Sequence, residues 1–449
     1  MKAKYRKTCA ALLAAGAFTV ALSWAHEIEK KEVEGPSKES AIEEGEKAGE
    51  GKADKLVLAE PKPITKEIEK GLKYLAHSQN DDGGWGQGGG WRVNTEASGR
   101  VEGAKAQDKS DVGNTCITML AFLRAGENLR TSPHAERLRK GVDYVMKQVT
   151  RSGDTDLYVT TVRDTQLQSK IGRYVDTFLA LQLLSELKDQ MPDKARETQR
   201  SELVDKIVAK IEKNQQDNGA FAGNGGWAAV LSQGICSRAL NGARLSGAKV
   251  SDVVLELDNR QNQDGLDVEG KAFTAPVAEG APSTAGIQLY STSSKLRGLQ
   301  ENWAVNRKRA EEFQKVVDSP TAPKEEKEKA QNELKKIADA DKARDAAAEA
   351  VAQSVKSDQF VAGFGNNGGE EFLSYMNVSE SLRLKGGQDW ADWDKKITVT
   401  INGAQNEDGS WSGHHCITGR NFCTAGALLT LMADRAPAPD AQEAVAATE

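Results

Sequence analysis

A short segment that ends in tryptophan occurs near both ends of the chain, and it limits the fold more than any other feature. The first copy spans residues 79–85 and the last spans 405–411; both begin with Gln-Asn and contain Asp-Gly. Weaker copies lie at 215–221 and 261–266. Self-similarity at wide intervals predicts a repeat protein in which each copy belongs to one structural unit.

Each copy follows a segment with helical periodicity. Apolar residues recur at every third and fourth position of 68–75, and Asn-Asp-Gly runs favour the left-handed turn that ends a helix. A second helical segment then follows, so the chain divides into helix pairs. The six predicted pairs are 68–79 with 111–123, 138–145 with 173–181, 203–214 with 231–240, 253–257 with 283–290, and two further pairs within 346–384 and 390–434.

Two details of these pairs suggest how they are arranged. Gly141 and Tyr144 in the second pair echo Gly71 and Tyr74 in the first. The first and last turn segments match each other better than either matches the copies between them. The sequence therefore predicts an all-α fold whose six pairs close into a ring, since an open array needs distinct end repeats.

The ends of the chain carry different signals. Residues 1–25 combine a basic start, an apolar run and a small-x-small site, and so predict a signal peptide and export to the periplasm or the cell exterior. The apolar run is too short for a stable membrane span. Residues 26–63 and 436–449 contain few large apolar side chains, which predicts a disordered tether and a disordered tail.

Charge narrows the range of partners. The 449-residue chain has a formal net charge of -6, which argues against nucleic-acid binding. Residues 301–345 are rich in Lys, Glu and Ala and are broken at Pro320 and Pro323. This composition predicts a charged helical insertion shaped as a hairpin between the helical segments 64–300 and 346–435. A second hypothesis makes the insertion a docking element for a protein partner.

The turn copies resemble the Gln-Trp repeats of the prenyltransferase and squalene-cyclase (squalene oxidase) superfamily. The resemblance covers 64–435 apart from the insertion. It implies the α/α toroid of terpenoid cyclases and protein prenyltransferases, an α6/α6 double barrel in which the second helix of each pair lines a lumen. It also implies structural roles for the turn residues, with Gln bonding to free carbonyls and the aromatic ring packing the next pair: Gln79, Trp85, Gln215, Phe221, Gln405 and Trp411.

The proton-initiated cyclases of this superfamily carry Asp-x-Asp-Asp at the start of a lumen helix, where paired carboxylates supply a strong acid. Residues 111–115 resemble this motif with its later acids replaced, and the full motif occurs nowhere else in the chain. Asp111 and Asp176 remain as candidate catalytic acids on lumen helices. A diphosphate ligand would need cations near the same helix starts, and the candidates are Arg173, Arg238 and Arg420.

The protein prenyltransferases of the superfamily hold zinc with Asp, Cys and His. The resemblance therefore suggests a zinc site, for which the candidate ligands are Cys116, His414, His415, Cys416 and Cys423. Motif alignment puts Cys116, Cys236 and Cys423 at equivalent helix starts, and ring closure would bring Cys116 towards Cys423. A Cys416–Cys423 disulfide is the preferred alternative, because exported proteins meet oxidising conditions.

Intact repeats beside incomplete catalytic motifs predict an exported binding or scaffold protein whose apolar lumen holds an apolar, isoprenoid or extended ligand. The alternative is a divergent isoprenoid-active enzyme, similar to a prenyltransferase or a terpenoid cyclase. A third hypothesis is a polysaccharide-active toroid. It would use Asp111 and Asp176 as its two carboxylates.

Overall fold

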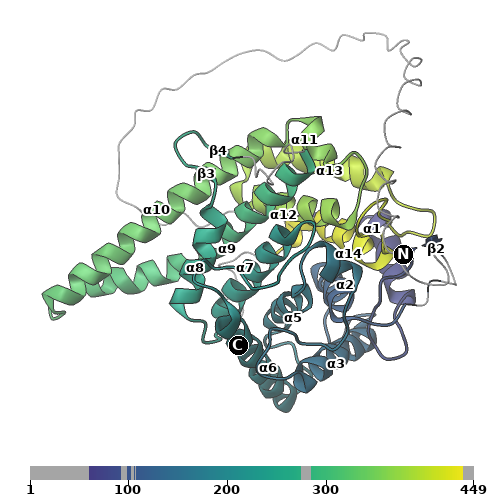
Figure 1. Ribbon diagram of the computed structural model, residues 1–449, viewed down its shortest axis with the longest axis horizontal. Coiled ribbons are helices and arrows are strands. Elements are labelled where there is room, and N and C mark those ends of the chain that lie inside the picture. The colour runs from purple at the N-terminus through teal and green to yellow at the C-terminus, as the bar shows by residue number, and fades with distance from the viewer. Residues whose placement is uncertain (1–59, 93–98, 103–105, 107, 275–284, 438–449) are drawn as a thin grey trace, which may run out of the picture. The chain divides into compact units, whose positions relative to one another are not determined.

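The computed structural model describes residues 60–92, 99–102, 106, 108–274 and 285–437 (Figure 1). Most of these residues are helical, which confirms the predicted all-α class. The described helices are α1 (Lys66–His77), α2 (Val112–Arg124), α3 (Ala135–Arg151), α4 (Gln166–Lys170), α5 (Val175–Glu186), α6 (Lys194–Asn214), α7 (Ala229–Leu245), α8 (Asp252–Gln263), α9 (Ala285–Asp318), α10 (Lys324–Ser354), α11 (Asp358–Ala362), α12 (Gly369–Lys385), α13 (Gly387–Gly403), α14 (Arg420–Leu431) and the short η2 (Ala433–Arg435). Two small antiparallel hairpins pair β1 (Gly90–Arg92) with β2 (Gly99–Val101) and β3 (Leu266–Asp267) with β4 (Ala272–Phe273).

Helices α2, α5, α7, α9, α12 and α14 form a series in which each helix contacts the next and α14 contacts α2 again. We call these six helices the closed series. Most of their residues are buried, except those of α9 beyond Asn306; in α5, every residue from Val175 to Ser185 is buried. Their other neighbours, such as α3, bury one stripe and expose the opposite side. The sequence pattern follows this division, because a helix surrounded by protein can be apolar on every face.

The glutamine that begins each of three turn segments links one helix pair to another. Gln79 Nε2 donates to the carbonyl oxygens of Gly83 at 2.8 Å and of Arg137, in α3, at 2.9 Å. Gln405 Nε2 donates to Gly409 O at 2.9 Å and to Glu67 O, in α1, at 2.8 Å. The glutamine of the last turn thus binds the first helix. Gln215 makes the same two kinds of contact at 3.4 Å, to Gly219 and to α8.

The tryptophan of each full turn segment also joins two pairs. Trp85 is fully buried and donates Nε1–H to Leu75 O at 2.7 Å, while its ring lies against Gly141 of α3. A Cβ at Gly141 would come within 3.0 Å of ring atom Cζ3. Trp411 lies in the same way against Gly71 of α1, where a Cβ would come within 2.9 Å. Glycine occurs at both positions, Gly71 and Gly141, because any larger side chain there would clash with the indole ring.

The charged insertion is a helical hairpin, as predicted, but it does not begin at residue 301. Helix α9 runs without a break from Ala285 to Asp318, and α10 packs beside it (Figure 1). Val305 is buried, so the first turns of the predicted insertion belong to the core. The hairpin is an extension of helices α9 and α10, and the break falls at the predicted prolines.

The ordered chain also extends slightly beyond the predicted segment ends. Lys62 N donates to Asp434 Oδ2 at 2.6 Å, and Ala436 is buried. The predicted signal peptide and most of the predicted tether and tail lie outside the described residues. None of the helices in the described ranges is both long and apolar enough to cross a membrane.

Candidate functional site

Five helices of the closed series meet at a buried group of charged side chains, which we call the Glu380 cluster. Its members are Glu380 of α12, Arg124 of α2, Glu186 of α5, Arg238 of α7, and Arg297 and Glu301 of α9. Glu380 Oε1 accepts from Arg124, and Oε2 lies 2.6 Å from Arg238 Nη1 and 3.2 Å from Arg297 Nη2. Arg238 also lies within 3.7 Å of Glu186 and Glu301.

These contacts join helices that are not neighbours in the closed series. Helices α2 and α7 each stand two places from α12, on opposite sides, so the Glu380 carboxylate lies towards the middle. Glu380 is fully buried and Arg238 is only 7% exposed. Burial alone would raise the pKa of Glu380, but Arg124, Arg238 and Arg297 hold it well below its usual range. The carboxylate is therefore ionised and compensated.

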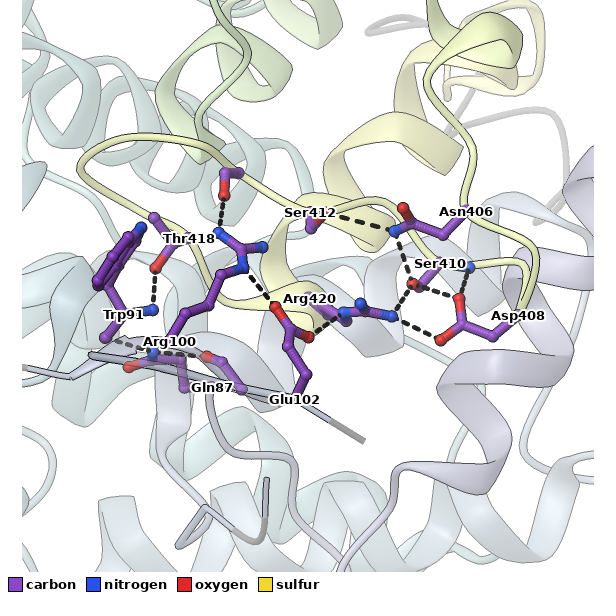
Figure 2. A network of polar contacts seen from close by, with 12 residues as sticks. Gln87, Trp91, Arg100, Glu102, Asn406, Asp408, Ser410, Ser412, Thr418 and Arg420 are labelled. Carbon is purple, nitrogen blue, oxygen red and sulfur yellow. Dashed lines mark hydrogen bonds and ion pairs between the residues drawn. The ribbon is translucent and has the colours of Figure 1, made fainter. Parts of the chain in front are cut away.

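The three arginines predicted to hold a diphosphate do not come together. Arg238 belongs to the Glu380 cluster, and Arg173 is exposed. Arg420 lies in the polar network of Figure 2, with Nε 2.6 Å from Glu102 Oε2 and Nη1 2.6 Å from Asp408 Oδ2. That network binds the loop after the first turn segment to the last turn segment. Because carboxylates of the protein already neutralise Arg238 and Arg420, these residues do not form an anion site together.

The two predicted catalytic acids are neighbours. Asp111 is the N-cap of α2, and Asp176 lies in the first turn of α5, where its Oδ1 accepts from Gly113 N at 2.8 Å. Burial raises the pKa of both carboxyl groups, and each is close enough to influence the other. Every carboxylate oxygen of the pair already accepts a hydrogen bond from the protein, from Asn114, Gly113 or Gln168. The pair therefore joins α2 to α5 and is held in place by hydrogen bonds within the protein.

The predicted zinc ligands do not converge. Burial, with Asp176 and Asp111 nearby, raises the pKa of the Cys116 thiol well above its usual value, so this side chain is a neutral core residue. Cys423 donates its thiol to Ile417 O at 3.6 Å, and His414 is exposed. Zinc binds thiolates and neutral imidazoles held within one coordination sphere. These residues do not fit that requirement.

The predicted Cys416–Cys423 disulfide is wrong as well, since all four cysteines in the described ranges are free. Cys416 lies in a loop with a left-handed backbone, φ 50°, whereas Cys423 is buried in α14. The alignment behind the cysteine prediction is shifted by two residues. Thr115 and Thr424 are equivalent, because their Oγ1 atoms accept from Trp85 N and Trp411 N, each at 2.9 Å. Cys423 therefore corresponds to Asn114, not to Cys116.

A cluster that the sequence analysis missed lies where α12 begins. One ligand atom each from Glu370, Glu371 and His415 lies within 4.8 Å of the others. Glu370 Oε2 accepts from Ile417 N at 3.2 Å, and its Oε1 has no hydrogen-bond partner. Of the five predicted metal ligands, only His415 takes part. Burial, with Glu371 nearby, raises the pKa of Glu370 to about 7, while hydrogen bonds to Cys416 and Glu371 raise that of His415 to about 10.

Aromatic side chains cover this cluster. Tyr290 donates its hydroxyl to Glu371 Oε1, and the Phe364 ring centroid lies 5.7 Å from that of Tyr290 and 5.9 Å from that of His415. Phe364 also contacts Trp227, which is 59% exposed. We call Trp227, Phe364, Tyr290 and His415 the aromatic face. The aromatic face reaches from buried carboxylates to solvent. The sequence feature that could have revealed it is the Gly-rich loop before α7, which carries Trp227, and the one before α12, which carries Phe364.

A separate groove of about 500 Å³ opens between α3 and α6 and is lined by Val142, Met146 and Arg196 among others. None of the predicted site residues lines it.

No protein-family model matches the chain, and no curated protein matches it. Function is therefore argued from the geometry of the chain itself.

Proposed function

We propose that the chain is an exported α/α toroid of the prenyltransferase and squalene-cyclase type that acts as a binding or scaffold protein. The closed series of helices and the bond from Gln405 to Glu67 support the toroid. The basic and apolar pattern of residues 1–25 supports export. Neither feature supports a chemical step.

The Glu380 cluster is the observation that carries this proposal. An enzyme that cyclises or transfers an isoprenoid needs a dry, apolar chamber for the hydrocarbon chain. Here charged side chains from five helices occupy the middle of the series, and exposure of Arg238 and Glu380 is 7% and 0%. Inserting a hydrocarbon at this level would separate buried ion pairs, and breaking one such pair costs roughly 3–5 kcal/mol.

The aromatic face is the surface that we assign to the ligand. Trp227 exposes a large ring beside Phe364, whereas most large apolar side chains in the described ranges are buried. Aromatic rings bind apolar or extended chains by stacking and by burial of apolar area. The ligand class predicted from the sequence is kept, but its place moves from the interior to this face.

Two measurements on the mature chain, beginning near His26, test the proposal. Squalene, and farnesyl diphosphate with a cysteine-containing peptide, should give no product. A native mass spectrum of the exported protein should show a bound ligand that is lost in Trp227→Ala and kept in the control Val253→Ala, whose side chain is 64% exposed on α8. Isoprenoid turnover that disappears in Asp176→Ala would overturn the proposal.

A further inference from the structure

We propose that Glu370, Glu371 and His415 form a binding site for one divalent transition-metal cation, Zn²⁺ or Mn²⁺. The proposal goes beyond the binding function above, which needs no metal. It begins from position: three side chains from the start of α12 and from the loop before α14 bring one ligand atom each within 4.8 Å of the others. A cation placed among them could contact all three with small side-chain adjustments.

Charge is the second step. Glu370 and Glu371 are both fully buried and adjacent, and His415 is the basic side chain that pairs with them among the described residues. Two buried carboxylates repel each other and lose hydration, and the single imidazole of His415 can offset at most one of the two negative charges. The Glu380 cluster supplies arginines for this purpose. A divalent ion would supply the equivalent charge here.

The unpartnered oxygen is the third and independent step. Glu370 Oε1 is buried and accepts no hydrogen bond, although Oε2 of the same group is bound to Ile417 N. More than nine-tenths of buried polar groups in proteins are hydrogen-bonded, so an orphan carboxylate oxygen inside a group of ligands points to a missing partner. A metal ion provides that partner.

The surrounding bonds hold the ligands in place. Glu371 Oε2 accepts from Gly368 N at 2.9 Å, and Oε1 accepts from Tyr290, which fixes the carboxylate at the start of α12. His415 Nε2 lies 3.2 Å from Glu371 Oε2 and 2.7 Å from Asn366 O, so this carbonyl could add a fourth ligand. Mixed imidazole and carboxylate ligands suit Zn²⁺ and Mn²⁺ better than Ca²⁺. Partial exposure of His415, 25% for its side chain, gives the ion a path from solvent.

The test uses the mature protein after chelation and dialysis, titrated with ZnCl₂ or MnCl₂ alone in a calorimeter, with bound metal counted by mass spectrometry. Wild type should bind one ion per chain. Glu370→Gln and His415→Gln should each weaken binding by at least about 100-fold, more than the ~10–100-fold typical when a supporting residue is lost. His414→Gln serves as the matched control from the same loop, and it should bind as wild type does.

Two results would overturn the proposal: no saturable binding of either ion to wild type, or equal binding by wild type, Glu370→Gln and His415→Gln. Loss of binding in His414→Gln alone, with binding kept in Glu370→Gln and His415→Gln, would also contradict it, because His414 would then be the ligand. Glu370→Gln keeps an oxygen for Ile417 N, so its circular dichroism spectrum should match wild type and separate lost binding from lost folding.

Discussion

Two regions of the closed series bury carboxylates to the same extent but surround them differently. Glu380 is fully buried among Arg124, Arg238 and Arg297, and its pKa is lowered despite burial. Glu370 is also fully buried, without an arginine partner among the described residues, and its pKa is raised to about 7. The Asp111 and Asp176 pair resembles Glu370 in this respect.

The comparison separates a closed structural contact from a site with room for a partner. Guanidinium groups can neutralise a buried carboxylate completely and satisfy its oxygens. Where arginines are absent, a carboxylate must take a proton, accept hydrogen bonds from the backbone, or bind a cation. Asp111 and Asp176 accept hydrogen bonds from the backbone and from the side-chain amides of Asn114 and Gln168, and Glu370 keeps one oxygen without a partner.

The largest effect is expected at Glu380. The change Glu380→Gln leaves three buried guanidinium groups undercompensated and should lower the free energy of unfolding by roughly 3–5 kcal/mol in urea denaturation. The control Glu349→Gln, which removes a partly exposed carboxylate 3.6 Å from Lys385, should cost about 1 kcal/mol or less. Equal effects of the two changes would remove the distinction between the regions.

The pH dependence at Glu380 has a definite sign. Because the folded-state pKa is lowered, its stabilisation is present above the ordinary pKa of 4.5 and is lost as the pH falls below that value. Wild type should therefore lose stability in acid more steeply than Glu380→Gln. Parallel curves for the two proteins would show that the arginines do not hold the carboxylate ionised.

The acid pair should show the opposite sign. Burial raises the folded-state pKa of Asp111 above its ordinary 3.8, so its contribution is full below that value and is lost as the pH rises through the raised pKa. At about 1.4 kcal/mol per pKa unit, wild type should lose roughly 1–4 kcal/mol between about pH 4 and pH 8. Asp111→Asn should flatten this slope. Its new amide can bond to Asn114 Oδ1, which has no partner in wild type.

The smallest effect is expected for Glu370→Gln in the presence of chelator. The change removes an uncompensated buried charge and keeps an acceptor for Ile417 N, so the free energy of unfolding should stay within about 1 kcal/mol of wild type or rise. Urea denaturation in EDTA measures this. A loss as large as that of Glu380→Gln would mean that the charge of Glu370 stabilises the apo protein.

Much of the fold could be predicted because its rules are local. A turn needs a glycine with positive φ, as at Gly83 and Gly409, and the buried tryptophan needs a glycine on the next helix, as at Gly141 and Gly71. Both needs leave a repeated pattern in the sequence. The helix pairs and the breaks at the prolines were therefore predictable.

The candidate sites were harder to predict because their members come from distant helices. Arg124, Arg297 and Glu380 share no motif, and only the crossing of the series brings them together. Glu370 and Glu371 looked like ordinary acids in the first turn of a helix. The disulfide prediction counted cysteines without regard to where their side chains lie. Cys416 is a loop residue with a left-handed backbone, whereas Cys423 is buried in helix α14.

Anomalous diffraction from crystals of the mature chain pressurised with xenon tests most directly whether the middle of the closed series is filled. Xenon occupies dry apolar cavities and avoids filled, charged interiors. We predict no xenon peak beside the Glu380 carboxylate. A peak enclosed by α2, α7 and α12 beside Glu380 would reveal an apolar chamber. That result would contradict the binding-only account and favour an isoprenoid enzyme.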